Sequence, residues 1–206
     1  MPRDRCYILG SSSDLGNLTG DFYDNNVTIG INRAYIRSDE LGRQMDYWIA
    51  HDKYLAFHPW VQGRHAPDTQ KYIRFEYYDE PIAVDYFKKV EAGKREDHLN
   101  FYMVRPATDF LFMPGRMPSG LTILDDMGFT IFTAISLAIL QGFKDIRFRG
   151  VSLKGGYYGQ QMNEDRVCYH GPMLEIFKKI KEPLMRDGIM LRNETKDAEA
   201  IFEEYT

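Results

Sequence analysis

Short, almost uninterrupted apolar runs, separated by turns and helical segments, constrain the fold of this chain more than any other feature. They lie at residues 6–9, 27–31, 47–50, 72–75 and 146–151. In the first three runs apolar residues follow one another instead of alternating with polar ones, which is typical of central strands covered on both faces. The sequence therefore predicts a three-layer α/β fold, with a mostly parallel central sheet and helices on both faces.

Two segments have clear helical patterns. Residues 129–140 are apolar nearly all round and end just before Gly142, which predicts a buried central helix. Residues 172–186 form an amphipathic pattern, and Pro183 is expected to kink or interrupt that helix. Further elements are expected as helices near 82–90 and 195–205 and as strands near 101–104 and 188–191. The order of strands in the region 76–127 stays open.

Length and charge limit the classes of protein to which the chain belongs. With 206 residues and a hydrophobic fraction of 44%, residues 1–206 are expected to form a single domain with one core. The net charge of -4 gives no overall reason to bind nucleic acid or an anionic membrane. A peripheral membrane contact and a homo-oligomer stay open.

The cysteines and the apolar runs bear on the compartment. Cys6 and Cys168 are too few for a disulfide framework and lack the spacing of a zinc site, so a reducing compartment is expected. The first strand pattern begins too early for a secretory signal, and no apolar run reaches about 18 residues. These observations predict a cytoplasmic protein.

The turn Gly10-Ser11-Ser12-Ser13 follows the first predicted strand. Small residues let the backbone turn sharply there, and the amide groups of the coming helix start suit a phosphate. The turn matches neither the dinucleotide glycine fingerprint nor the Walker pattern. The alternative interpretation is an ordinary helix start capped by serine.

Polar residues also follow the next two predicted strands. Ligands of open α/β sheets lie where parallel strands end, and Asn32 and Asp52 come at such ends. Asn32 offers a donor and an acceptor to a base or sugar, whereas Asp52 can hold a hydroxyl or a metal. Alternatively, Asn32 begins a turn and Asp52 caps a helix.

Arg116 and Ser119 lie in a predicted turn ahead of the central helix. A fixed cation beside a hydroxyl can bind an anion, although an ordinary loop explains these residues equally well. Asp125 and Asp126 follow them, and we interpret these two as solvated acids in preference to a metal pair.

His170 is the best-placed candidate for a general acid or base. It precedes a predicted helix, and its imidazole exchanges a proton near neutral pH. Tyr157 and Tyr158 lie in the preceding glycine-rich segment, where phenols can stabilise a leaving phosphate without a metal. The alternative is a histidine that only caps the helix. Cys168 has no visible paired base and is interpreted as a bystander.

The order of these motifs resembles that of bacterial sialyltransferases that extend lipooligosaccharides, and of the related family that includes archaeal 6-hydroxymethylpterin diphosphokinases. The resemblance spans about residues 5–192. It rests on the strand and small-residue turn at 7–15, the strand ending in Asn32, the Arg-x-x-Ser-Gly element at 116–120, the glycine-containing strand at 144–152, and Tyr157, Tyr158 and His170. The stretch between Ser119 and the central helix is longer than in the family pattern.

The resemblance implies a Rossmann-like glycosyltransferase that uses a cytidine-monophosphate sugar and requires no metal. In that family's scheme Gly10, Ser11, Ser12 and Asn32 hold the nucleotide. Tyr157 and Tyr158 steady the departing phosphate, and His170 is the base for a glycan or small-molecule acceptor.

Two alternatives to sugar transfer stay open. One is a magnesium-dependent diphosphokinase of the hydroxymethylpterin type, which would enlist Asp52 with Asp125 or Asp126. The other is a protein that binds a nucleotide or sugar phosphate without catalysis.

Overall fold

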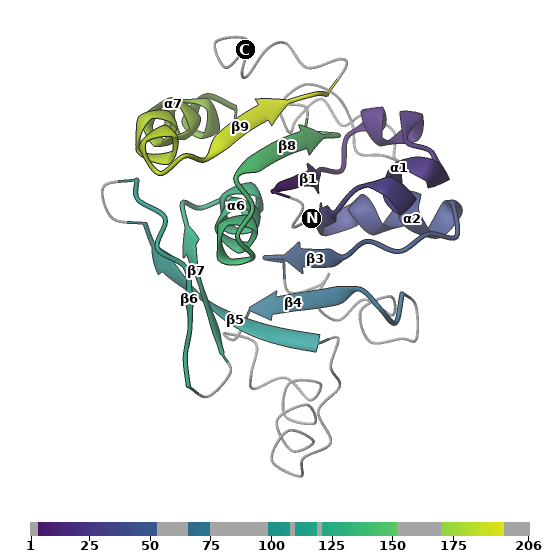
Figure 1. Cartoon of the computed structure of the whole chain (residues 1–206), viewed down its shortest axis with the longest axis horizontal. Coiled ribbons are helices and arrows are strands. Elements are labelled where there is room, and N and C mark those ends of the chain that lie inside the picture. The colour runs from purple at the N-terminus through teal and green to yellow at the C-terminus, as the bar shows by residue number, and fades with distance from the viewer. Residues whose placement is uncertain are drawn as a thin grey trace.

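A single sheet organises the chain. The structure, a computed structural model, describes residues 4–52, 66–74, 99–107, 110–118, 121–151 and 170–195. Within them, nine strands form one sheet in the order β6-β7-β5-β4-β3-β2-β1-β8-β9 (Figure 1). The strands are β1 (Arg5–Leu9), β2 (Thr28–Ile31), β3 (Tyr47–Ala50), β4 (Gln70–Arg74), β5 (Leu99–Pro106), β6 (Gly115–Arg116), β7 (Thr122–Asp126), β8 (Asp145–Arg149) and β9 (Met190–Asn193). All neighbouring pairs are parallel except β6 with β7.

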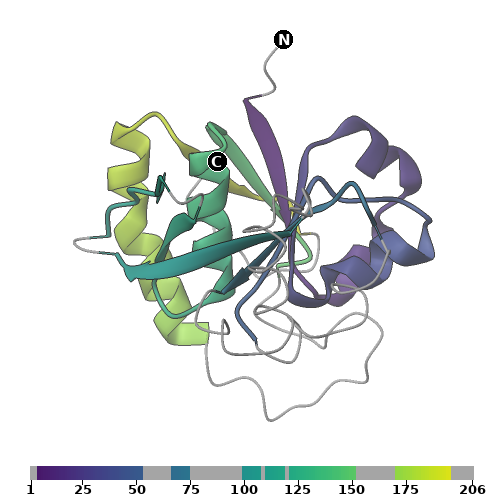
Figure 2. The same cartoon turned by 90° about the horizontal axis from the view of Figure 1, so that it is seen from below.

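Helices cover both faces of this sheet, as the sequence predicts. Figure 2 shows α6 and α7 on one side and α1 and α2 on the other. The side chains of β1 alternate accordingly: Cys6 and Ile8 join the core beneath α6 and α7, whereas Tyr7 and Leu9 join the core beneath α1 and α2. The helices are α1 (Gly20–Asn25), α2 (Tyr35–Glu40), α6 (Thr130–Leu140) and α7 (His170–Arg186), with short 3-10 helices η1 (Ser13–Asn17) and η2 (Asn32–Ala34).

The chain changes direction at β1. From β1 it moves outward through β2, β3, β4, β5 and β7, then crosses back through α6 to β8, on the other side of β1. The topological switch point therefore lies between the carboxyl ends of β1 and β8. In open α/β sheets this is the preferred place for a ligand.

Most of the central elements agree with the sequence-based predictions, but several elements differ. The strand expected at 101–104 is longer, and β7 was not predicted because it lies in the irregular-looking region. Pro183 does not interrupt α7, because the helix continues through it to Arg186. The helix predicted at 82–90, and nearly all of that predicted at 195–205, lie outside the described residues. None of the described helices is long and apolar enough to cross a membrane.

Candidate functional site

The turn after β1 packs directly against the end of β8. The Gly10 amide donates to the Arg149 carbonyl at 2.8 Å, and the Ser12 amide donates to the Gly150 carbonyl at 2.9 Å. A Cβ atom on Gly10 would lie 2.1 Å from the Gly150 oxygen, so only glycine fits. The sequence-based expectation of open amides therefore needs a correction, because two amides of this turn are already satisfied by β8.

The serines of the turn differ in their surroundings. Ser13 is exposed and opens η1, while Ser11 and Ser12 are each only 8% exposed. Ser12 occupies the N-cap position but its side chain makes no capping hydrogen bond. Its Oγ atom is buried and has no hydrogen-bond partner among the described residues. The serine-cap alternative therefore does not explain this hydroxyl.

Asn32 has a strained backbone and an unsatisfied side chain. Its φ of 50° lies in the left-handed region, which is costly for residues other than glycine. The Trp48 indole Nε1 donates to the Asn32 carbonyl at 2.8 Å and helps to hold this conformation. The Asn32 Oδ1 atom is buried without a partner within the part of the chain that the structure describes. Asn32 follows β2, so it lies at the strand end next to the turn of Ser12.

A histidine that was not among our predicted binding or catalytic residues lies at the same edge. His51 follows β3, and its Nε2 atom is 2.5 Å from the Thr133 Oγ1 atom of α6. The Thr133 hydroxyl in turn donates to Asp126 Oδ1 at 3.4 Å. Which of His51 and Thr133 donates in this contact depends on the tautomer of the imidazole ring. Because His51 and Thr133 are 82 positions apart in the sequence, only the fold reveals this chain of contacts.

The carboxylates suggested for a metal site differ in their surroundings. Asp52 is exposed after β3. Asp125 is almost completely buried, where its side chain pairs with Arg105 at 2.7 Å and accepts from the Met113 amide at 2.6 Å. Asp125 is therefore not the solvated acid that we expected, because it lies within the unpredicted strand β7. In the described ranges no group of three acidic, histidine or cysteine side chains is arranged to hold a metal.

Arg116 lies at the opposite edge of the sheet from the turn of Ser12. It belongs to β6 and pairs with Thr122, the first residue of β7. It also acts electrostatically on Tyr47 at the start of β3, where burial and then Asp46 raise the pKa of the phenol and Arg116 opposes them. Arg116 therefore lies in a strand and not in a turn directly before α6, and its role in binding an anion stays a prediction.

The remaining predicted residues are only partly placed. Ser119, Tyr157 and Tyr158 lie outside the described residues. His170 begins α7, but its side chain lies outside the described set. Since α7 connects the parallel strands β8 and β9, its first residue belongs to the same sheet edge as Gly10.

Cys6 is unsuited to nucleophilic chemistry. It is fully buried in β1, and burial, with smaller effects of Asp145 and Asp46, raises the pKa of its thiol far above the ordinary value. The thiol therefore stays protonated. Cys168 lies outside the described residues.

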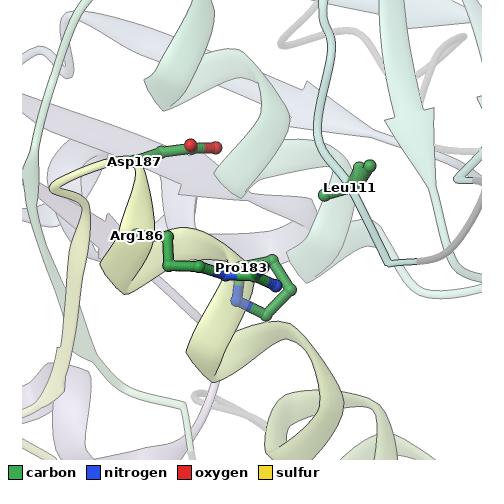
Figure 3. Close-up of a pocket in the computed structure, with 4 residues that line it drawn as sticks. All are labelled: Leu111, Pro183, Arg186 and Asp187. Atoms are coloured by element: carbon green, nitrogen blue, oxygen red, sulfur yellow. The ribbon is translucent and has the colours of Figure 1, made fainter.

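A shallow pocket lies elsewhere, at the end of α7. It has a volume of about 300 Å³ and is lined by Leu111, Pro183, Arg186 and Asp187 (Figure 3). The end of α7 is at the amino-terminal edge of the sheet, so this pocket is separate from the switch point.

The fold and the switch point define a Rossmann-like α/β protein with a candidate ligand site at the carboxyl ends of β2, β1 and β8. Comparison of the sequence with models of protein families gave no match, and neither did comparison with curated proteins. The resemblance to sialyltransferases therefore stays a hypothesis.

Proposed function

We propose that this chain binds a nucleotide-type ligand at the carboxyl ends of β1 and β2 and transfers a sugar from it. The observation that carries the binding proposal is a pair of buried polar atoms, Ser12 Oγ and Asn32 Oδ1, that have no partner among the described residues. Each such atom costs about 1–3 kcal/mol of stability when it is left unsatisfied. A ligand that hydrogen-bonds to both atoms recovers that free energy on binding.

The two atoms favour a ligand with two different ends. The Ser12 hydroxyl can donate to a phosphate oxygen, whereas Asn32 Oδ1 can only accept, so it needs a hydroxyl or an amino group. Neighbouring strands are separated by about 4.8 Å, which suits adjacent parts of one nucleotide. A ribose hydroxyl or the exocyclic amine of cytosine supplies the donor for Asn32.

The reaction proposed is glycosyl transfer from a cytidine-monophosphate sugar. In this step the acceptor hydroxyl oxygen forms a bond to the anomeric carbon, and the bond from that carbon to the phosphate oxygen breaks. His170 takes the proton of the acceptor hydroxyl, while Tyr157 and Tyr158 hydrogen-bond to the departing cytidine monophosphate. The support for these roles is the sequence resemblance, together with the position of the start of α7 at the sheet edge that carries Ser12.

Thermal unfolding in the presence of nucleotides tests the binding proposal. Cytidine monophosphate is expected to raise the Tm of the wild type without magnesium, because a ligand that binds only the folded state stabilises it by mass action. Ser12→Ala should reduce this rise. Ser38→Ala is the matched control, since Ser38 is also buried but its hydroxyl donates to the Tyr35 carbonyl in α2. Equal Tm rises in the wild type and Ser12→Ala would contradict the proposal.

Release of cytidine monophosphate from a cytidine-monophosphate sugar tests the transfer. His170→Ala should lower the rate about 10²- to 10⁴-fold, the usual contribution of a general base. Binding without turnover across a panel of glycan acceptors would instead favour a non-catalytic binding protein. A response to adenosine triphosphate that requires magnesium would favour the diphosphokinase alternative, in which Asp126 rather than the buried Asp125 would join Asp52.

A further inference from the structure

Four arginines gather on one face of β1, β8 and β9. Ile146 and Phe148 of β8 point into the core beneath α6 and α7, so the alternate residues of β8 lie on the other face. The arginine cluster consists of Arg5, Arg147, Arg149 and Arg192, and it contains two carboxylates, Asp145 and Glu194. The cluster therefore has a formal excess of two positive charges in a chain whose net charge is -4.

The two carboxylates are shared unequally. Arg147 is hydrogen-bonded to both Asp145 and Glu194. Although burial of Asp145 acts in the opposite direction, its hydrogen bonds from Arg147 and Arg5 lower the pKa of the carboxyl. Among the described residues, Arg149 makes one contact to an acid, from Nη2 to Glu194 Oε2 at 3.5 Å. The charge of Arg147 is thus balanced locally, whereas that of Arg149 is balanced weakly.

Arg149 is also the member of the cluster closest to the switch point. It is the last residue of β8 and pairs with Leu9, the last residue of β1. The next residue, Gly150, accepts the hydrogen bond from the Ser12 amide. The Arg149 Nε atom is buried, and no described residue accepts a hydrogen bond from it. A positively charged side chain with an unsatisfied N–H therefore belongs to the strand end whose backbone is bonded to the turn that carries the unsatisfied Ser12 hydroxyl.

We propose that Arg149 binds the phosphate of the ligand, so that the phosphate lies over β1 and β8 and the hydroxyl or amino end of the ligand reaches Asn32 on β2. This inference rests on the proposed function and adds the orientation of the ligand. A guanidinium is suited to the task because its donors match phosphate oxygens. The amides of Gly10 and Ser12 are already bonded to the carbonyls of Arg149 and Gly150. The group that binds the phosphate is therefore a side chain and not this part of the turn.

The experiment compares cytidine monophosphate with cytidine in calorimetric titrations of the full chain. Arg149→Gln is expected to weaken binding of cytidine monophosphate about 10- to 100-fold, the usual range for a hydrogen bond to a charged group, and to leave cytidine unchanged. Glu194→Gln should tighten binding of cytidine monophosphate, because it removes the carboxylate that competes for Arg149. Arg192→Gln is the matched control, since Arg192 is in the same cluster but 47% of its side chain is exposed on β9. It should bind like the wild type.

Several outcomes would overturn the inference. Equal weakening of cytidine monophosphate and cytidine by Arg149→Gln would mean that Arg149 only supports the fold. If Arg149→Gln does not fold, Arg149→Lys takes its place, because lysine keeps the charge but loses the planar array of donors. The proposal would be contradicted if Arg149→Lys preferred cytidine monophosphate to cytidine as strongly as the wild type does and Glu194→Gln bound cytidine monophosphate more weakly.

Inorganic phosphate separates this inference from the proposed function. If no nucleotide binds the wild type, but phosphate raises its Tm and does not raise that of Arg149→Gln, the nucleotide proposal fails and the anion site stands. If no nucleotide binds and phosphate raises the Tm of both proteins equally, or of neither, the role of Arg149 is refuted.

Discussion

Replacing Asn32 with glycine should make the protein more stable and its ligand binding weaker. The left-handed φ of 50° costs about 1 kcal/mol at asparagine, and glycine adopts it freely. Loss of the unsatisfied Oδ1 atom removes a further penalty of about 1–3 kcal/mol. Glycine gains more freedom in the unfolded chain, which offsets about 0.5–1 kcal/mol. The net expectation is a rise of about 1–3 kcal/mol in the free energy of unfolding.

Urea unfolding and nucleotide titration measure the two effects separately. In thermal unfolding, the Tm should rise by about 2–4 °C for each kcal/mol of added stability in a chain of this size. Binding of cytidine monophosphate should weaken about 3- to 10-fold, the equivalent of one lost hydrogen bond. The bond from Trp48 to Asn32 should persist, because it uses the backbone carbonyl.

Ala66→Gly is the matched control for the backbone. Ala66 also has a left-handed φ, of 47°, but it precedes β4 at the other edge of the sheet and has no polar side chain. Its replacement should leave nucleotide binding unchanged and give a smaller change in stability. The reasoning is refuted if Asn32→Gly is less stable than the wild type, or if it binds cytidine monophosphate as tightly.

Three further predictions concern Gly10, Asp145 and Cys6. Gly10→Ala should lower the free energy of unfolding by about 3 kcal/mol in urea denaturation, because its Cβ would collide with the Gly150 carbonyl just after β8. Gly115→Ala should be neutral, because nothing lies near the added Cβ. Asp145→Asn should lose stability relative to the wild type above about pH 4, and the difference should shrink as pH falls through the lowered pKa of Asp145; a difference that does not depend on pH would contradict this. Cys6 should resist iodoacetamide in the native protein between pH 7 and 9 and react after unfolding, as peptide mapping by mass spectrometry can determine; rapid native labelling would show that the thiol is accessible.

Sequence reasoning succeeded where short-range pattern decides structure. The apolar runs predicted the central strands because a strand buried on both faces needs apolar residues at successive positions, as in β1. Asn32 and the serine turn were selected for the same reason, since they directly follow such strands. The strands β6 and β7 were missed because their residues are mixed in polarity, and so Arg116, which lies in β6, was expected in a turn before the central helix.

The sequence by itself determined the α/β class, the buried central helix and the strand ends at which polar residues gather. Only the tertiary structure decided which of these ends adjoin, because strand order depends on pairing between residues far apart in the chain. That order brings Arg149 beside Ser12 through the pairing of β1 with β8, although well over a hundred positions separate them. It also shows that two amides of the turn are already bonded. Unsatisfied atoms are a property of packing, so no sequence pattern identifies Ser12 Oγ, Asn32 Oδ1 and Arg149 Nε as the groups that a ligand would complete.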